Sequence, residues 1–134
     1  DYLVVEGAGG WLVPLNGRES FADLATAVSS KVIMLVAVKL GCINHALLTA
    51  QAIRHSGATL VGWVANFIEP DAQNDPVARN IVDTLSGRIA SPKLAELPYI
   101  AEIGREGVSA GEQLAAITRL DLARKIDLTP LLRC

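Results

Sequence analysis

Short runs of apolar residues alternate along the chain with longer segments in which apolar positions recur at helical spacing. The run at 32–38 is continuous and rich in β-branched side chains, which is typical of a strand buried on both faces. Residues 45–55 instead place Ala46, Leu47, Ala50 and Ile53 on one face of a helix. We expect strands at 2–5, 32–38, 60–65 and 94–97, and helices at 20–29, 45–55, 77–86 and from 111 onward.

Turn and cap residues mark the ends of these elements. Ser20 and Asp23 form a capping-box pattern, with an acid three positions after a helix-starting serine. We expect Asn44 to cap the helix that follows the second strand. A polar loop at 69–76 separates the third strand from the next helix, and Pro98 ends the fourth strand. This alternation predicts an α/β fold, a parallel β-sheet flanked by helices, in a single domain at 1–134.

Composition narrows the class of protein. The chain has 134 residues, of which 51% are hydrophobic and 19% charged, so a buried core is available. The net charge is −2 and no basic cluster stands out, which argues against a nucleic-acid partner. The longest apolar run is far too short to cross a bilayer, so we expect no membrane contact. Cys42 and Cys134 have neither disulfide-framework nor metal-ligand spacing, so we expect a reducing cytoplasm.

Two groups of residues fall just after strands, where parallel sheets bind ligands. Glu6 is followed by a glycine cluster; a carboxylate suits magnesium, and glycines let backbone amides approach an anion. A solvated acid in a tight turn explains these residues equally well. The helix start at Cys42, Ile43 and Asn44 is a candidate carboxylate or phosphate site. From the local sequence alone, a simple turn and cap is favoured there.

Two further groups follow the third and fourth strands. Asn66 has the donor and acceptor needed to read a base edge, although an asparagine satisfied by its own turn fits as well. Residues 96–100 could form the wall of a base site, while an ordinary strand end with Tyr99 on the surface is favoured in isolation. A dyad of Cys42 and His45 is rejected, because no third group is evident to orient it.

Taken together, these stretches resemble the dethiobiotin synthetase family from residue 1 to about residue 100. The motifs are Val-Glu-Gly-Ala-Gly-Gly-Trp at 5–11, Gly-Cys-Ile-Asn-His at 41–45, Gly-Trp-Val-Ala-Asn at 62–66 and Glu-Leu-Pro-Tyr at 96–99. The second motif is very specific. The resemblance implies a ligase of biotin biosynthesis that uses ATP and Mg²⁺. It closes the ureido ring of dethiobiotin from 7,8-diaminononanoate and CO2 through a phosphorylated carbamate.

The resemblance also implies roles for individual residues. Glu6 matches the magnesium-binding carboxylate of the family. A further acidic nucleotide contact falls near Glu102 or Glu106, and the resemblance does not choose between them. The substrate carboxylate would bind at the subunit interface of a homodimer. The implied ATP-binding residues are Glu6, Gly7, Ala8, Gly9, Asn66, Phe67, Pro98, Tyr99 and Ile100, and the implied substrate-binding residues are Cys42, Ile43 and Asn44.

One family motif does not occur in these 134 residues. There is no phosphate-binding loop of the form Gly-x-x-x-x-Gly-Lys-Thr, and no lysine stands in the context of the family's catalytic lysine. We therefore assign no catalytic residue and expect the C-terminal part of a P-loop NTPase-like domain, inactive alone. The alternatives are a related P-loop amidotransferase or cobyrinate-type synthase, expected to lack Gly-Cys-Ile-Asn-His, and a non-catalytic truncated dimerisation module.

Overall fold

The computed structural model describes residues 4–7, 9–28, 31–103, 106–107, 109, 112–113 and 129. Within these ranges, no helix has both the length and the apolar content needed to cross a membrane. The elements in chain order are α1 (Phe21–Val28), β1 (Lys31–Val38), α2 (Cys42–His55), β2 (Thr59–Phe67), the short 3-10 helix η1 (Ala72–Asn74), α3 (Pro76–Arg88) and β3 (Lys93–Leu97).

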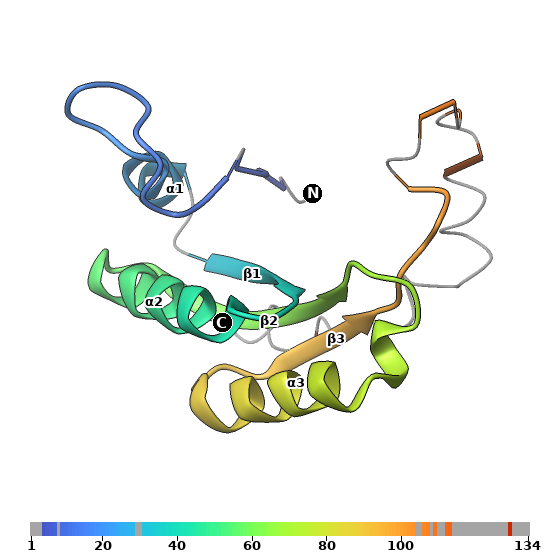
Figure 1. Ribbon diagram of the computed structural model, residues 1–134. Helices are drawn as coiled ribbons and strands as arrows, with labels where there is room; N and C mark the ends of the chain where they lie inside the picture. Colours follow the sequence, from blue (N-terminus) through green and yellow to red (C-terminus); the bar gives the residue numbers. More distant parts are fainter. Residues whose placement is uncertain are drawn as a thin grey trace.

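The three strands form one parallel sheet in the order β1-β2-β3 (Figure 1). A helix makes each crossover, as parallel neighbours require. The predicted α/β fold with a parallel sheet is therefore confirmed. Because the strands run the same way, their carboxyl ends share one edge of the sheet. Val38 pairs with Phe67 and Asn66 pairs with Leu97 at that edge.

The main hydrophobic core lies between one face of the sheet and the helices α2 and α3. Alternation along β1 turns Met34, Val36 and Val38 toward this core, as expected for a strand. Residues of the predicted apolar face of α2 pack against them. The core members from the other elements include Ala46, Ala50, Ile53, Leu60, Trp63, Ala65, Phe67, Ile81, Val82 and Leu85.

The opposite face of the sheet carries a smaller cluster. Val64, Leu94 and Ala95 are buried there, but Leu35 on β1 is 64% exposed. The sequence pattern predicted helices over strands that are apolar on both faces. In the described part of the chain, α2 and α3 share one core and leave β1 half open on the other side. Local apolarity does not reveal which face receives a helix.

Residues 4–7 do not form the predicted first strand. Val4 and Val5 are 88% and 58% exposed and belong to no strand, while residues 2–3 lie outside the described residues. A parallel strand needs hydrogen bonds from a neighbour, and no described strand pairs with this segment. Figure 1 shows the N-terminal segment apart from the three-stranded sheet. The tail helix predicted from 111 falls almost entirely outside the described residues.

Two helix starts were predicted, and one prediction was wrong. At α1 the amide and hydroxyl of Ser20 both donate to Asp23 Oδ2 at 2.7 Å, which is one half of a capping box; the Asp23 amide donates to the Ser20 carbonyl at 3.1 Å rather than to its hydroxyl. Asn44 does not cap α2. The cap is Gly41, whose φ of 86° is left-handed and inexpensive only without a Cβ. Asn44 is consequently the third residue of the helix.

Candidate functional site

The carboxyl edge of the sheet brings three predicted segments into neighbouring positions. The turn 39–41 follows β1, the loop 68–75 follows β2, and residues 98–103 follow β3. The pair Asn66–Leu97 is the last between β2 and β3, so the chain leaves β3 at Pro98 beside the end of β2. Asn66 and Pro98, predicted separately, therefore lie on adjacent strands at one edge.

The side chains at this edge differ in what they can offer a ligand. Asn66, Pro98 and Ile100 are half-buried, and Tyr99 is 39% exposed. Phe67 is only 2% exposed and its ring belongs to the core, so its side chain is not available to a ligand at this edge. An amide at the rim with an apolar segment beside it has the chemistry to hold a planar heterocycle.

The start of α2 presents backbone amides rather than side chains. The amide of Cys42 donates to Lys39 O at 3.1 Å, and the Cys42 side chain is buried. Ile43 and Asn44 follow as the second and third helical residues, whose amides have no partner within a helix. Asn44 is exposed and Ile43 half-buried. This helix start has the dipole and the donors that an anion requires.

The glycine-rich segment lies away from the paired strands. Glu6 and Gly7 are exposed, and Gly9 has a φ of 147° that favours glycine. Ala8 lies outside the described residues. The segment is attached further along, where Trp11 packs against the main core. Sequence reasoning placed Glu6 on a strand end; the described residues hold it on an exposed loop instead.

An ion-paired cluster beside the carboxyl edge escaped sequence reasoning. Arg79 on α3 donates to Glu96 on β3 through Nη1 to Oε2 at 2.5 Å and through Nη2 to Oε1 at 3.4 Å. Lys93 also bonds Glu96 Oε1. Burial raises the pKa of Glu96, but the hydrogen bonds from Arg79 and Lys93 outweigh it and hold that pKa below its usual value. The bond to Glu96 in turn raises the pKa of Arg79.

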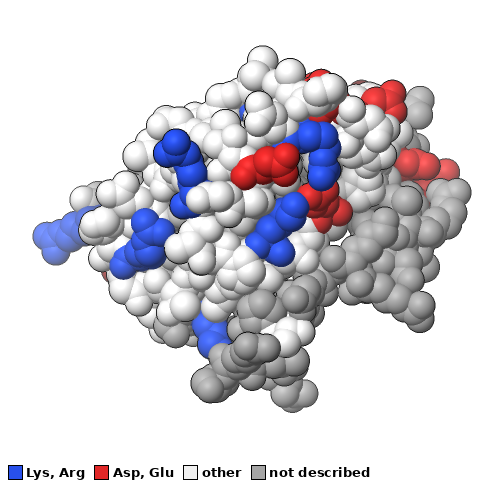
Figure 2. All heavy atoms as spheres, turned by 90° about the horizontal axis from the view of Figure 1, so that it is seen from below, with Lys and Arg blue, Asp and Glu red and all other residues white. Residues whose placement is uncertain are grey.

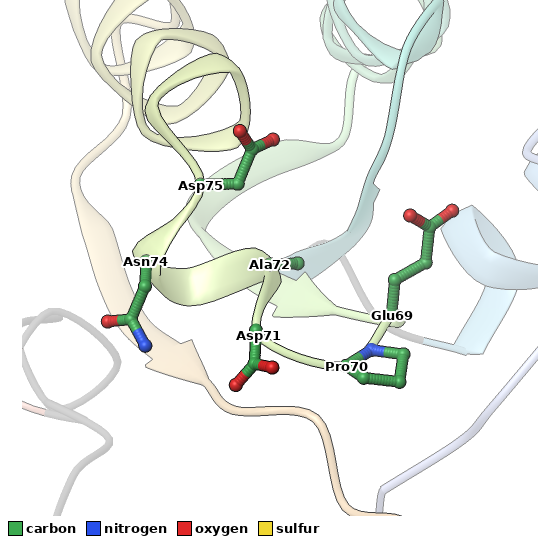
Figure 3. Close-up of a pocket in the computed structure, with 6 residues that line it drawn as sticks. All are labelled: Glu69, Pro70, Asp71, Ala72, Asn74 and Asp75. Atoms are coloured by element: carbon green, nitrogen blue, oxygen red, sulfur yellow. The ribbon is translucent and has the colours of Figure 1, made fainter.

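The loop 68–75 lines a shallow pocket with three acidic side chains. In Figure 3 the carboxylate of Asp71 points away from those of Glu69 and Asp75. Asp75 is already used, because it accepts from the amides of Val77 and Ala78 at the start of α3. Among the residues that the structure describes, no three His, Cys, Asp or Glu side chains gather as a metal site.

The charged side chains are unevenly distributed on the visible face. In Figure 2, Lys and Arg side chains are spread over the left half, Asp and Glu side chains lie toward the right, and the two kinds stand side by side near the middle. The ion pairs of Glu96 with Arg79 and Lys93 are of this mixed kind.

Three parallel strands joined through helices, together with the family match below, give an α/β fold of the P-loop NTPase-like class. Comparison with known families gives the assignment within that class. The family model described as an AAA domain matches residues 1–107. The chain belongs to this family.

Curated relatives are more specific. The chain is 45% identical over 131 residues to an ATP-dependent dethiobiotin synthetase BioD of Yersinia pestis, covering 98% of the chain and 50% of the relative. It is 49% identical over 102 residues to BioD 1 of Escherichia coli, covering 76% and 44%. It is 42% identical over 132 residues to BioD of Cellvibrio japonicus, covering 98% and 50%. The chain spans about half the length of the curated relatives it matches.

Proposed function

We propose that the chain is part of a cytoplasmic, ATP-dependent dethiobiotin synthetase. Its reaction would join CO2 to 7,8-diaminononanoate as a carbamate, activate the carbamate with ATP, and close the ureido ring. The similarity to relatives of that name supports this proposal. The AAA domain family and the P-loop NTPase-like fold support the use of a nucleotide.

The pairing of Asn66 with Leu97 is the observation that carries the nucleotide site. It brings the end of β2 at Asn66 next to the end of β3, directly before the segment 98–100. In this proposal Asn66 hydrogen-bonds the base edge with its donor and acceptor, and the backbones of Phe67, Pro98, Tyr99 and Ile100 line the ring. With the adenine bound there, the phosphates of ATP would extend along the same edge of the sheet.

The start of α2 is proposed to hold the carboxylate of the diamine. The amides of Ile43 and Asn44 supply donors, and the helix dipole favours a negative charge there. The side chain of Cys42 is buried, and this packing holds the first turn of α2 against the core. The acid end of the substrate would thus bind far from the amines that react, which suits an orienting contact rather than a catalytic one.

Glu6 is proposed to hold Mg²⁺. The ion takes hard oxygen ligands and usually keeps waters and substrate phosphates, so one exposed carboxylate fits it. When bound, the ion supplies charge neutralisation for the phosphates. The backbones of Gly7, Ala8 and Gly9 would approach those phosphates closely. The P-loop and catalytic lysine of the family do not occur in these 134 residues, so we expect no turnover by this chain alone.

An apolar groove supports a homodimer. Residues 10–14 and α2 enclose about 400 Å³, with Leu12 and Leu48 69% and 57% exposed beside it. A second copy covering this groove would remove both leucines from water. Sedimentation of the full-length protein should show a dimer that Leu48→Asp dissociates. A wild-type monomer at micromolar concentration contradicts this part of the proposal.

Isothermal titration of the full-length protein tests the assignment of the site. Asn66→Ala should weaken ATP binding by roughly 5- to 100-fold through a lost hydrogen bond and leave the diamine unaffected. Glu6→Ala should abolish most of the dependence of ATP binding on Mg²⁺. Glu19→Gln, which alters another exposed acid of the N-terminal segment, is the matched control. Unchanged nucleotide and metal binding in both test variants would remove these residues from their roles.

A further inference from the structure

Backbone pairing joins β2 and β3 only up to one residue pair near their carboxyl ends. The ladder between them finishes at Asn66 and Leu97. The next residues are Phe67 and Pro98, and a proline has no amide proton to donate. On its other side Phe67 still pairs with Val38 of β1. Beyond the Asn66–Leu97 pair, side-chain contacts can therefore add to the restraint that the ladder places on Phe67 and Pro98.

Arg79 is the side chain that touches both strand ends. Its guanidinium forms a two-pronged contact with Glu96, two residues before Pro98. The same group lies over the ring of Phe67, with Cζ 5.7 Å from the ring centroid. A planar guanidinium can satisfy a carboxylate in its plane while its face or edge lies against an aromatic ring. One residue of α3 thus links the ends of two strands.

The geometry of this link is anchored at both sides. The amide of Arg79 donates to Asp75 O at 2.9 Å in the first turn of α3, and the Asp75 side chain caps that turn. Glu96 is held by Lys93 as well as by Arg79. Phe67 is almost completely buried. The three contact groups consequently have little freedom to drift.

We infer that Arg79 is a positioning residue for the nucleotide base. By holding Glu96 and the Phe67 ring it restrains how the segment 98–100 leaves β3 beside Asn66, and these are the two sides of the base site. This inference rests on the proposed function. If Arg79 only stabilised the packing of α3, its loss would weaken the binding of all ligands alike. If it positions the base site, its loss would weaken the binding of ligands that carry a base.

The test compares two ligands on the full-length protein, Mg-ATP and Mg-tripolyphosphate, which lacks the base. Arg79→Met keeps an apolar side chain but removes the guanidinium, and with it the two-pronged contact and the positive charge. Since small misplacements can cost as much as 100-fold in enzymes, we expect roughly tenfold weaker ATP binding and unchanged tripolyphosphate binding. For Arg79→Lys, which keeps the charge but not the two-pronged contact, the ATP affinity should fall between that of the wild-type protein and that of Arg79→Met. Arg88→Met, in the last turn of the same helix, is the matched control.

A second pair of variants guards against loss of folding. In R79E/E96R the charges are exchanged, and we expect ATP binding to recover at least part of what R79E alone loses. Equal loss for both ligands, or no loss of ATP affinity in a folded Arg79→Met protein, overturns the inference. If wild-type protein binds no Mg-ATP, the proposed function fails instead, so the two failures are distinguishable.

Discussion

The carboxyl edge of the sheet and the N-terminal segment carry comparably distinctive motifs but are held in different ways. At the edge, backbone ladders and a buried core fix where Asn66 and Pro98 lie. In the segment 4–20, the described contacts are a packed Trp11 and local turns, and Glu6 is exposed. A motif therefore specifies chemistry, while the partners of the surrounding backbone specify position.

The two tryptophans give the largest expected contrast between these regions. Trp63 on β2 is completely buried, whereas Trp11 is half-buried. Trp63→Ala should lower the free energy of unfolding by about 3–5 kcal/mol because it leaves a large cavity. Trp11→Ala should cost about 1–2 kcal/mol, since less apolar area is lost. Urea denaturation of the full-length protein measures both, and equal costs would contradict the contrast.

The next contrast is steric and lies within the sheet region. A Cβ on Gly62 would lie 2.5 Å from Leu94 Cγ, so the buried Leu94 side chain would have to shift. Gly62→Ala should cost about 1–3 kcal/mol of stability through overpacking. Gly87 on α3 has nothing within 4 Å, so Gly87→Ala should raise stability by up to about 1 kcal/mol. Thermal unfolding of the two variants should show shifts of opposite sign.

Helix caps compare the two regions at a smaller scale. Asp75 accepts from two amides at the start of α3, so Asp75→Ala should cost about 1 kcal/mol. At α1 the Ser20 hydroxyl only donates to Asp23, and the Ser20 backbone amide would keep its own bond to that acid. Ser20→Ala should therefore cost less, about 0.5 kcal/mol. A larger loss for Ser20→Ala in the same denaturation assay would reverse this ranking.

The smallest effect concerns pH. The pKa of Glu96 is lowered in the fold, so its ionised form stabilises the protein above the ordinary glutamate pKa, about 4.3. This contribution is lost as pH falls through the lower, folded-state pKa. Glu96→Gln should therefore weaken the dependence of the unfolding free energy on pH in this acidic range. Unfolding free energies measured in steps below pH 5 test this; an unchanged slope would show that the ion pairs with Arg79 and Lys93 add nothing.

Local patterns predicted much of the sheet. The strands at 32–38, 60–65 and 94–97 lie within the observed β1, β2 and β3, because continuous apolar runs bounded by turn residues are typical of buried strands. The same logic failed at Val4 and Val5, since local apolarity cannot tell whether a neighbouring strand supplies hydrogen bonds. It failed at Asn44 because glycine's left-handed conformation, not a polar side chain, ends the turn.

The candidate site was predictable only residue by residue. Asn66 and Pro98 were each found from their motifs, but their adjacency depends on the register between β2 and β3. Arg79 and Glu96 are 17 positions apart and lie on a helix and a strand. Nothing in the local sequence pairs them. The signal that could have suggested this pair is a basic residue in the first turns of a helix, here Arg79, followed by a strand that carries an acid, here Glu96.

The start of α3 has a consequence for how this part of the protein tolerates insertions. Asp75 caps the helix, Pro76 is its first residue, and Asp71 just before has a left-handed φ of 57°. Moving the helix start by one residue would turn every side chain by about 100° and carry Arg79 away from Glu96. Length variation between β2 and α3 is thereby discouraged, because Arg79 must keep its contact with Glu96.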